Sequence, residues 1–165
     1  MNNAGGERFR MHLKQIGELG MVLLLIFICS YMVNFIWESF HAVFLYEDHD
    51  FNARKYVLMV SYVSAIDGFL ILGIYLLIAA LWRDLAWIRE INGKQICAVL
   101  LAGLLLAAAI EYRKVFVTRT WNYNRLMPTF FGLGLSPLLQ LSSTGLWAFW
   151  LSGRVLYQRG KPAGR

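Results

Sequence analysis

The chain has 165 residues, of which 58% are hydrophobic and 16% are charged. An ordinary soluble domain carries about 25% charged residues, so this composition indicates a single domain whose solvent is a lipid bilayer. The formal net charge of +6 suits anionic lipid head groups. Because the sequence has no nucleic-acid motif and no basic stripe mixed with aromatic residues, we exclude nucleic acid as a partner.

Four apolar segments are long enough to cross a bilayer, whose hydrocarbon core of about 30 Å needs about 20 helical residues. We predict an all-α integral membrane protein with one transmembrane domain over residues 1–165. Its spans are expected at about 18–44, 56–82, 95–117 and 129–153. Because the connections are short, sequential helices should be antiparallel neighbours, which favours an up-down four-helix bundle.

Lysine and arginine are unequally distributed between the two ends of this bundle. Ten lie in the terminal segments and the second connection, against six in the first and third connections. The positive-inside rule then predicts cytoplasmic termini and a multi-pass protein of the cell inner membrane. Arg8, Arg10 and Lys14 imitate the start of a signal peptide, but the apolar run that follows is too long, so we expect a retained helix.

Asp67 is the most unusual residue within the spans. A carboxylate near the centre of a spanning helix costs about 2.5 to 3.5 kcal/mol on insertion scales. Asp67 lies too deep in its helix for its short side chain to reach water. It must therefore be protonated, paired or facing an internal cavity, and Ser64 on the same helix face is a candidate hydrogen-bond donor.

Polar residues of the other three helices are expected near the same depth. Asn34, Glu38 and His41 are spaced so that they share one face of the first helix, and a polar face in a membrane turns inward. Glu111 of the third helix should lie level with Glu38, and Gln140 of the fourth level with Asp67. The candidate catalytic residues are Asp67, Glu38, Glu111 and His41, and the candidate ligand-binding residues in the spans are Asn34 and Gln140.

Two other interpretations of these polar residues stay open. Interhelical polar contacts can hold a bundle together without chemistry, at about 0.6 to 2 kcal/mol each. The same residues could also form an ion or proton path. Among these residues, Asp67 most strongly favours a functional site.

The third connection combines basic and aromatic residues with two prolines. Arg113, Arg119 and Arg125 are candidates for holding a lipid phosphate or another anion, and Trp121 and Tyr123 suit the head-group layer. We expect all five to lie against the mouth of the bundle, although plain anchoring of the helix ends explains them equally well. Further on, Pro137 is expected to break the fourth helix and free the carbonyl of Leu133, with Gln140 as a candidate partner.

Metal and cofactor chemistry are weakly supported. Glu38 and His41 could begin a metal site, and the turn 47–50 adds His49 and three acids, but a ferritin-like centre needs a second Glu-x-x-His motif. We therefore assign no metal, and the cofactor is unknown. The segment FFGLGLSP contains neither a nucleophile elbow nor a dinucleotide-binding loop.

The segment from Glu111 to Gln140 reads EYRKVFVTRTWNYNRLMPTFFGLGLSPLLQ. Its acid, W-x-Y, M-P, G-x-G-L and P-L-L-Q resemble small four-span membrane proteins of proteobacteria. More distantly, it is similar to the membrane carotenoid hydratases and small lycopene cyclases, which carry paired glutamates where this chain has leucines and Gln140 after Pro137. The resemblance implies that a protonated carboxylic acid, best placed at Asp67, adds a proton to an isoprenoid double bond.

The sequence predicts a carboxylate-rich site in the outer half of the bundle that binds a lipid or isoprenoid or performs acid–base chemistry on it. The alternative is a non-catalytic membrane subunit or assembly partner of a larger complex. Expected partners are membrane lipids and a hydrophobic small molecule, with a homo-oligomer or larger membrane complex left open. Whether the chain is an enzyme also stays open, and a transporter is disfavoured because four helices show no inverted repeat.

Overall fold

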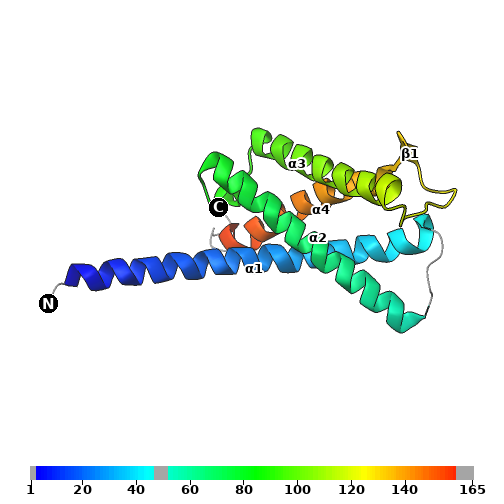
Figure 1. The fold of residues 1–165 in the computed structure, drawn as a ribbon. Helices are drawn as coiled ribbons and strands as arrows, with labels where there is room; N and C mark the ends of the chain where they lie inside the picture. The colour runs from blue at the N-terminus through cyan, green and yellow to red at the C-terminus, as the bar shows by residue number, and fades with distance from the viewer. Residues whose placement is uncertain (1–2, 47–51, 159–165) are drawn as a thin grey trace, which may run out of the picture.

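The computed structural model describes residues 3–46 and 52–158, with side chains described for 14–46 and 52–157. Four α-helices dominate the fold: α1 (Asn3–Leu45), α2 (Ala53–Trp82), α3 (Gly93–Tyr112) and α4 (Leu135–Gly153) (Figure 1). A 3-10 helix η1 (Trp87–Arg89) lies between α2 and α3, and π-helical turns η2 (Arg113–Val117) and η3 (Arg154–Gln158) extend α3 and α4. The predicted all-helical fold class is confirmed.

Three helical segments are long and apolar enough to cross a membrane. They are Lys14–Leu45 of α1, all of α2, and Gly93–Val117, which joins α3 to η2. The fourth helix is less apolar because it carries Gln140 and several serine and threonine residues. The composition of these segments thus supports a membrane protein, as the sequence indicates.

The helices are unequal in length. At 1.5 Å per residue, the 43 residues of α1 extend over about 64 Å, and its N-terminal part projects well beyond the other helices (Figure 1). The second helix crosses α1 obliquely in this view, while α4 packs against both α1 and α3. The small strand β1 (Thr129–Phe130) lies at the end of the molecule opposite to the N-terminus.

A dry aromatic core fills the bundle where α2 ends and α3 begins. Tyr75, Trp87 and Phe149 are at most 2% exposed, and the rings of Trp87 and Phe149 have centroids 5.2 Å apart. The indole Nε1 of Trp87 donates to the carbonyl of Tyr75 at 3.3 Å, and the Tyr75 hydroxyl donates to the carbonyl of Leu85. This packing leaves no room between these rings for a continuation of the polar cavity at the other end of the bundle.

Small residues let α3 and α4 approach closely. A Cβ added to Gly103 would lie 2.7 Å from the backbone nitrogen of Ser142, so only glycine fits there. The Ser142 hydroxyl also donates to the carbonyl of Leu100 at 2.9 Å. Close backbone contact and interhelical hydrogen bonds are the usual means by which helices associate in membranes, where no hydrophobic force drives them together.

The fourth helix begins later than the sequence predicts. Residues 129–134, placed at the start of the fourth span, instead form an antiparallel hairpin of β1 (Thr129–Phe130) and β2 (Leu133–Gly134). Its turn holds Phe131 and Gly132, both with positive φ, of 50° and 78°. The helix follows directly after β2.

The expected break at Pro137 is wrong. Pro137 is the third residue of α4, which runs without interruption to Gly153. The first backbone N–H groups of a helix have no partner within that helix, so a proline there removes no hydrogen bond. Pro137 therefore marks the beginning of α4 and causes no interruption within it.

Candidate functional site

A partly enclosed cavity of about 150 Å³ lies between the four helices at the end of the bundle that carries the third connection. A cavity of this size holds about one benzene molecule, or roughly five waters at about 30 Å³ each. Every helix contributes to its wall, and so does the loop after α3. Its polar and aromatic wall comprises Glu38, His41, Tyr46, Asp67, Glu111, Trp121 and Gln140.

Gln140 joins two of the carboxyl groups. Its Nε2 lies 2.5 Å from Oε1 of Glu38, 2.9 Å from Oδ2 of Asp67 and 3.1 Å from Oδ1 of Asn34. A side-chain amide has only two N–H donors for these three acceptors. One acceptor therefore needs a hydrogen from another source, and a proton on either carboxyl group would supply it.

Asn34 lies one helical turn before Glu38 in α1 and contacts the same amide nitrogen of Gln140. Its side chain is fully buried and does not line the cavity, and its Nδ2 donates to the carbonyl of Ser30 at 2.9 Å. This bond orients Oδ1 of Asn34 toward Gln140. The expected bond from Ser64 to Asp67 is wrong, because the Ser64 hydroxyl donates to the carbonyl of Val60 on its own helix at 2.7 Å.

Glu111 forms a second polar group on the cavity wall. It is 1% exposed, and the hydroxyl of Tyr123 donates to its Oε2, while the hydroxyl of Tyr46 lies 3.5 Å from its Oε1. Within the described residues Glu111 forms no ion pair, although Arg113 and Lys114 lie close by in the sequence. Two tyrosines hold this carboxyl group instead.

The loop after α3 is fastened to the end of α1. Tyr46 and Tyr123 form an antiparallel bridge, and Nδ2 of Asn124 donates to the carbonyl of Phe44 at 2.6 Å. The backbone N–H of Gly134 donates to the Tyr123 hydroxyl at 3.0 Å, which connects β2 to the same group. Tyr123 therefore couples the hairpin, the loop and Glu111.

The two tyrosines stay neutral in the folded protein. Burial raises the pKa of Tyr123 above its usual value, and its hydrogen bond to Glu111 raises it further. Burial, followed by the charge of Glu111, raises the pKa of Tyr46 in the same direction. Both phenols thus remain hydrogen-bond donors across the whole neutral range.

His41 lies at the boundary between polar and apolar surroundings. It is 3% exposed, and its ring contacts Tyr46 edge-on with centroids 4.9 Å apart. It lines the polar cavity and also an apolar groove of about 490 Å³ that runs along α1. Trp37 and Phe40 are among the other residues of that groove.

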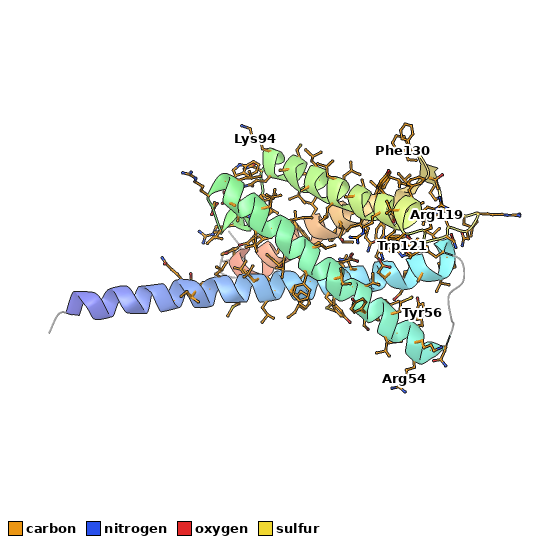
Figure 2. All side chains as sticks on the ribbon, viewed as in Figure 1. Arg54, Tyr56, Lys94, Arg119, Trp121 and Phe130 are labelled. Carbon is orange, nitrogen blue, oxygen red and sulfur yellow. The ribbon has the colours of Figure 1, made fainter. Side chains whose placement is uncertain are left out.

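The aromatic and basic residues of the third connection separate in space. Trp121 and Tyr123 are half-buried against Tyr46, with ring centroids 5.8 Å and 5.6 Å away. Figure 2 places Arg119 and Trp121 at the same end of the molecule. However, Arg113, Arg119 and Arg125 are exposed and none of them lines the cavity, so our expectation that they lie against its mouth is wrong.

No group of three or more metal-ligating side chains within residues 14–46 and 52–157 is arranged to hold an ion. Glu38 and His41 line the cavity without a third such ligand in position. The acidic turn 47–50, with His49, lies outside the described residues.

Sequence reasoning missed Tyr46 and the groove residues around Trp37. Tyr46 follows the last residue of α1 and falls off the face that carries Glu38 and His41, so helical spacing gave no signal for it. The groove residues are apolar in an apolar helix, where nothing in composition distinguishes them from lipid-facing positions. Comparisons with protein-family models, with curated proteins and with solved structures gave no match.

Proposed function

We propose that the chain is a four-span protein of the inner membrane with both termini in the cytoplasm, and that α4 is the fourth span. The 19 residues of α4 include no charged side chain. Three of its hydroxyl groups donate within the protein: Ser142 to the carbonyl of Leu100 at 2.9 Å, and Ser143 and Thr144 to the carbonyls of Leu139 and Gln140, both at 2.8 Å. Polar groups that find partners inside a bundle are tolerated at membrane depth.

We further propose that the polar cavity binds the functional end of a lipid or isoprenoid and performs acid–base chemistry on it. The observation that carries this proposal is that Glu38, Asp67 and Glu111, from three different helices, line one cavity together with His41. Interhelical contacts that serve only stability would pack tightly and leave no space between the acids. Here the space is large enough for a small organic group.

The acids suit the transfer of a proton in two steps. A neutral carboxylic acid gives its proton to a carbon–carbon double bond, which leaves a carboxylate and a carbocation. A neighbouring carboxylate then removes a proton from an adjacent carbon, which restores a neutral product and moves the double bond. Asp67 and Glu38 are the best placed for these roles, because both contact the same amide nitrogen of Gln140.

The packing at the far end of the bundle favours a confined site rather than a proton path across the membrane. Tyr75, Trp87 and Phe149 fill the interior there and are at most 2% exposed. The polar residues of the cavity wall extend no deeper into the bundle than Asp67 and Gln140. A ligand would therefore enter the cavity from the bilayer or from the third-connection side.

The test is the lipid content of three proteins extracted from native membranes directly into polymer-bounded discs: wild type, Asp67→Asn and Glu90→Gln. Glu90 is exposed and lies outside the cavity, so it controls for the loss of one acidic group. We expect wild type and Glu90→Gln to retain the same enriched lipid or isoprenoid, and Asp67→Asn to accumulate a form that differs in its double bonds. If all three carry only bulk lipid, the proposal fails and a non-catalytic subunit is favoured.

The proposed topology has a separate test. In a background with Cys29→Ala and Cys97→Ser, single cysteines at the exposed positions Asn52 and Asn122 should react with an impermeant reagent added to intact cells. Reaction only after the membrane is opened would invert the topology.

A further inference from the structure

The apolar groove along α1 has the shape expected for one hydrocarbon chain. Val33, Ile36, Phe40 and Phe44 follow one another along the helix, so the groove extends over roughly 16 Å at 1.5 Å per residue. Ser136 of α4 borders the groove on its other side. The groove volume of about 490 Å³ exceeds that of the polar cavity about threefold.

The groove and the polar cavity meet at one side chain. His41 lines both, so a molecule could lie with its chain in the groove and its end in the cavity without leaving the protein surface. The cavity itself, at about 150 Å³, has room for a head group but not for a whole lipid. Together the two volumes fit an amphiphile with one chain and a compact head.

The charges on the cavity wall indicate the sign of that head. Apart from Tyr46, its ionisable wall residues are three carboxyl groups and His41, and no lysine or arginine of the described residues lines it. A phosphate or sulfate placed there would face like charges in a medium of low dielectric constant, where repulsion is strong. The ring of Tyr46 on the same wall would in contrast attract a cation, as the ring of Trp121 already does with Nζ of Lys114, 5.6 Å from its centroid.

The hydrogen bonds around Gln140 lead to the same conclusion without reference to net charge. The two N–H groups of Gln140 serve three acceptor oxygens, of which two belong to the carboxyl groups of Glu38 and Asp67 on the cavity wall. A head group that accepts further hydrogen bonds would find no donor at Gln140. One that is positively charged would complement the acceptor that Gln140 cannot serve.

We propose that the ligand of this site is a single-chain amphiphile with a cationic head, such as an alkylammonium, whose chain lies along α1 and whose head occupies the acidic cavity. This inference rests on the proposed function and narrows its ligand class. It excludes the anionic lipid head group that the arginines of the third connection suggest.

The test uses three photoactivatable probes that share a hexadecyl chain and differ only in the head: trimethylammonium, sulfate or hydroxyl. Each is added to protein in nanodiscs, and mass spectrometry measures the labelled fraction of residues 33–45. The variants are Glu38→Gln and Phe40→Ala, with Glu90→Gln and Phe69→Ala as controls. Phe40 and Phe69 are matched, with exposed fractions of 62% and 65%, but Phe69 does not line the groove.

In the wild type we expect the ammonium probe to label this segment about tenfold more than the sulfate probe, which corresponds to about 1.4 kcal/mol. Glu38→Gln should bring that ratio toward one, whereas Glu90→Gln should leave it unchanged. Phe40→Ala should reduce labelling by every probe, and Phe69→Ala by none. Helical content measured for each variant identifies any that fail to fold, and Asp67→Asn then serves in place of Glu38→Gln.

Each contrary result has a separate meaning. Equal labelling by the three heads would overturn the cationic ligand while leaving a lipid-binding site intact. Equal effects of Phe40→Ala and Phe69→Ala would overturn the groove as the place of the chain. If no probe labels residues 33–45 above the segment around Phe69, both this inference and the proposed function fail.

Discussion

Replacing Gln140 with leucine tests the centre of the site. The substitution keeps the approximate volume of the side chain but removes the only N–H groups that contact Glu38 and Asp67 among the described residues. Two carboxyl groups from α1 and α2 then face each other without the amide between them. The bundle should lose stability because α4 no longer bonds to either helix at this level.

The size of the loss follows from the number of donors. Interhelical hydrogen bonds in membrane proteins average about 0.6 kcal/mol and reach about 1.7 kcal/mol. Gln140 supplies two N–H donors, so Gln140→Leu should lower the free energy of unfolding by about 1 to 3 kcal/mol. The loss should be smaller when Asp67 is already asparagine, because the two residues share one contact.

A double-mutant cycle in mixed detergent micelles gives the measurement. The unfolding free energies of wild type, Gln140→Leu, Asp67→Asn and the double variant are followed by circular dichroism as dodecyl sulfate increases. A parallel cycle pairs Gln140→Leu with Glu90→Gln, where the effects should add because Glu90 lies at the far end of the bundle. A loss below about 0.5 kcal/mol, together with additivity in both cycles, would refute the role of Gln140 as the link between the acids.

Two further predictions concern packing and pH. Gly103→Ala places a Cβ 2.7 Å from backbone atoms of Ser142 and should lower the free energy of unfolding by about 1 to 3 kcal/mol. The control, Gly73→Ala, meets nothing within 4 Å and should stabilise α2 slightly. Unfolding titrations that give both variants the same stability would contradict this packing of α3 on α4. Because the pKa values of Tyr46 and Tyr123 are raised in the fold, the unfolded chain releases these protons first, so the unfolding free energy should fall as pH rises above the usual tyrosine value of about 10. Tyr123→Phe should flatten that fall, and an unchanged pH profile would count against its burial beside Glu111.

The depth of the polar residues could be read from the sequence because depth is a one-dimensional property. Along a helix each residue adds 1.5 Å, so the distance of Glu38, Asp67 and Gln140 from the ends of their apolar segments fixes their approximate level. The shared face of Asn34, Glu38 and His41 follows in the same way from helical periodicity. Neither inference depends on which helices are neighbours.

Other features depend on contacts between distant segments. The start of α4 at Leu135 follows from a hairpin whose strands are two residues each, too short for alternation of residue types to reveal. The hydrogen bonds of Tyr46 and Tyr123 to Glu111 require the loop to fold back on α1, and no spacing encodes that fold. The outward orientation of Arg119 and Arg125 follows from the same loop path.

The sequence by itself therefore determined that the chain is helical and at what level the acids lie in each helix, and three of the four spans that it predicts are long and apolar enough to cross a membrane. Local forces decide these properties: apolar composition over about 20 residues, and a rise per residue that varies little. Only the tertiary structure decided that Gln140 stands between Glu38 and Asp67, that two tyrosines hold Glu111, and that His41 joins a polar cavity to an apolar groove. These depend on how each helix is rotated about its axis and crosses its neighbours, which side-chain packing across the whole bundle sets.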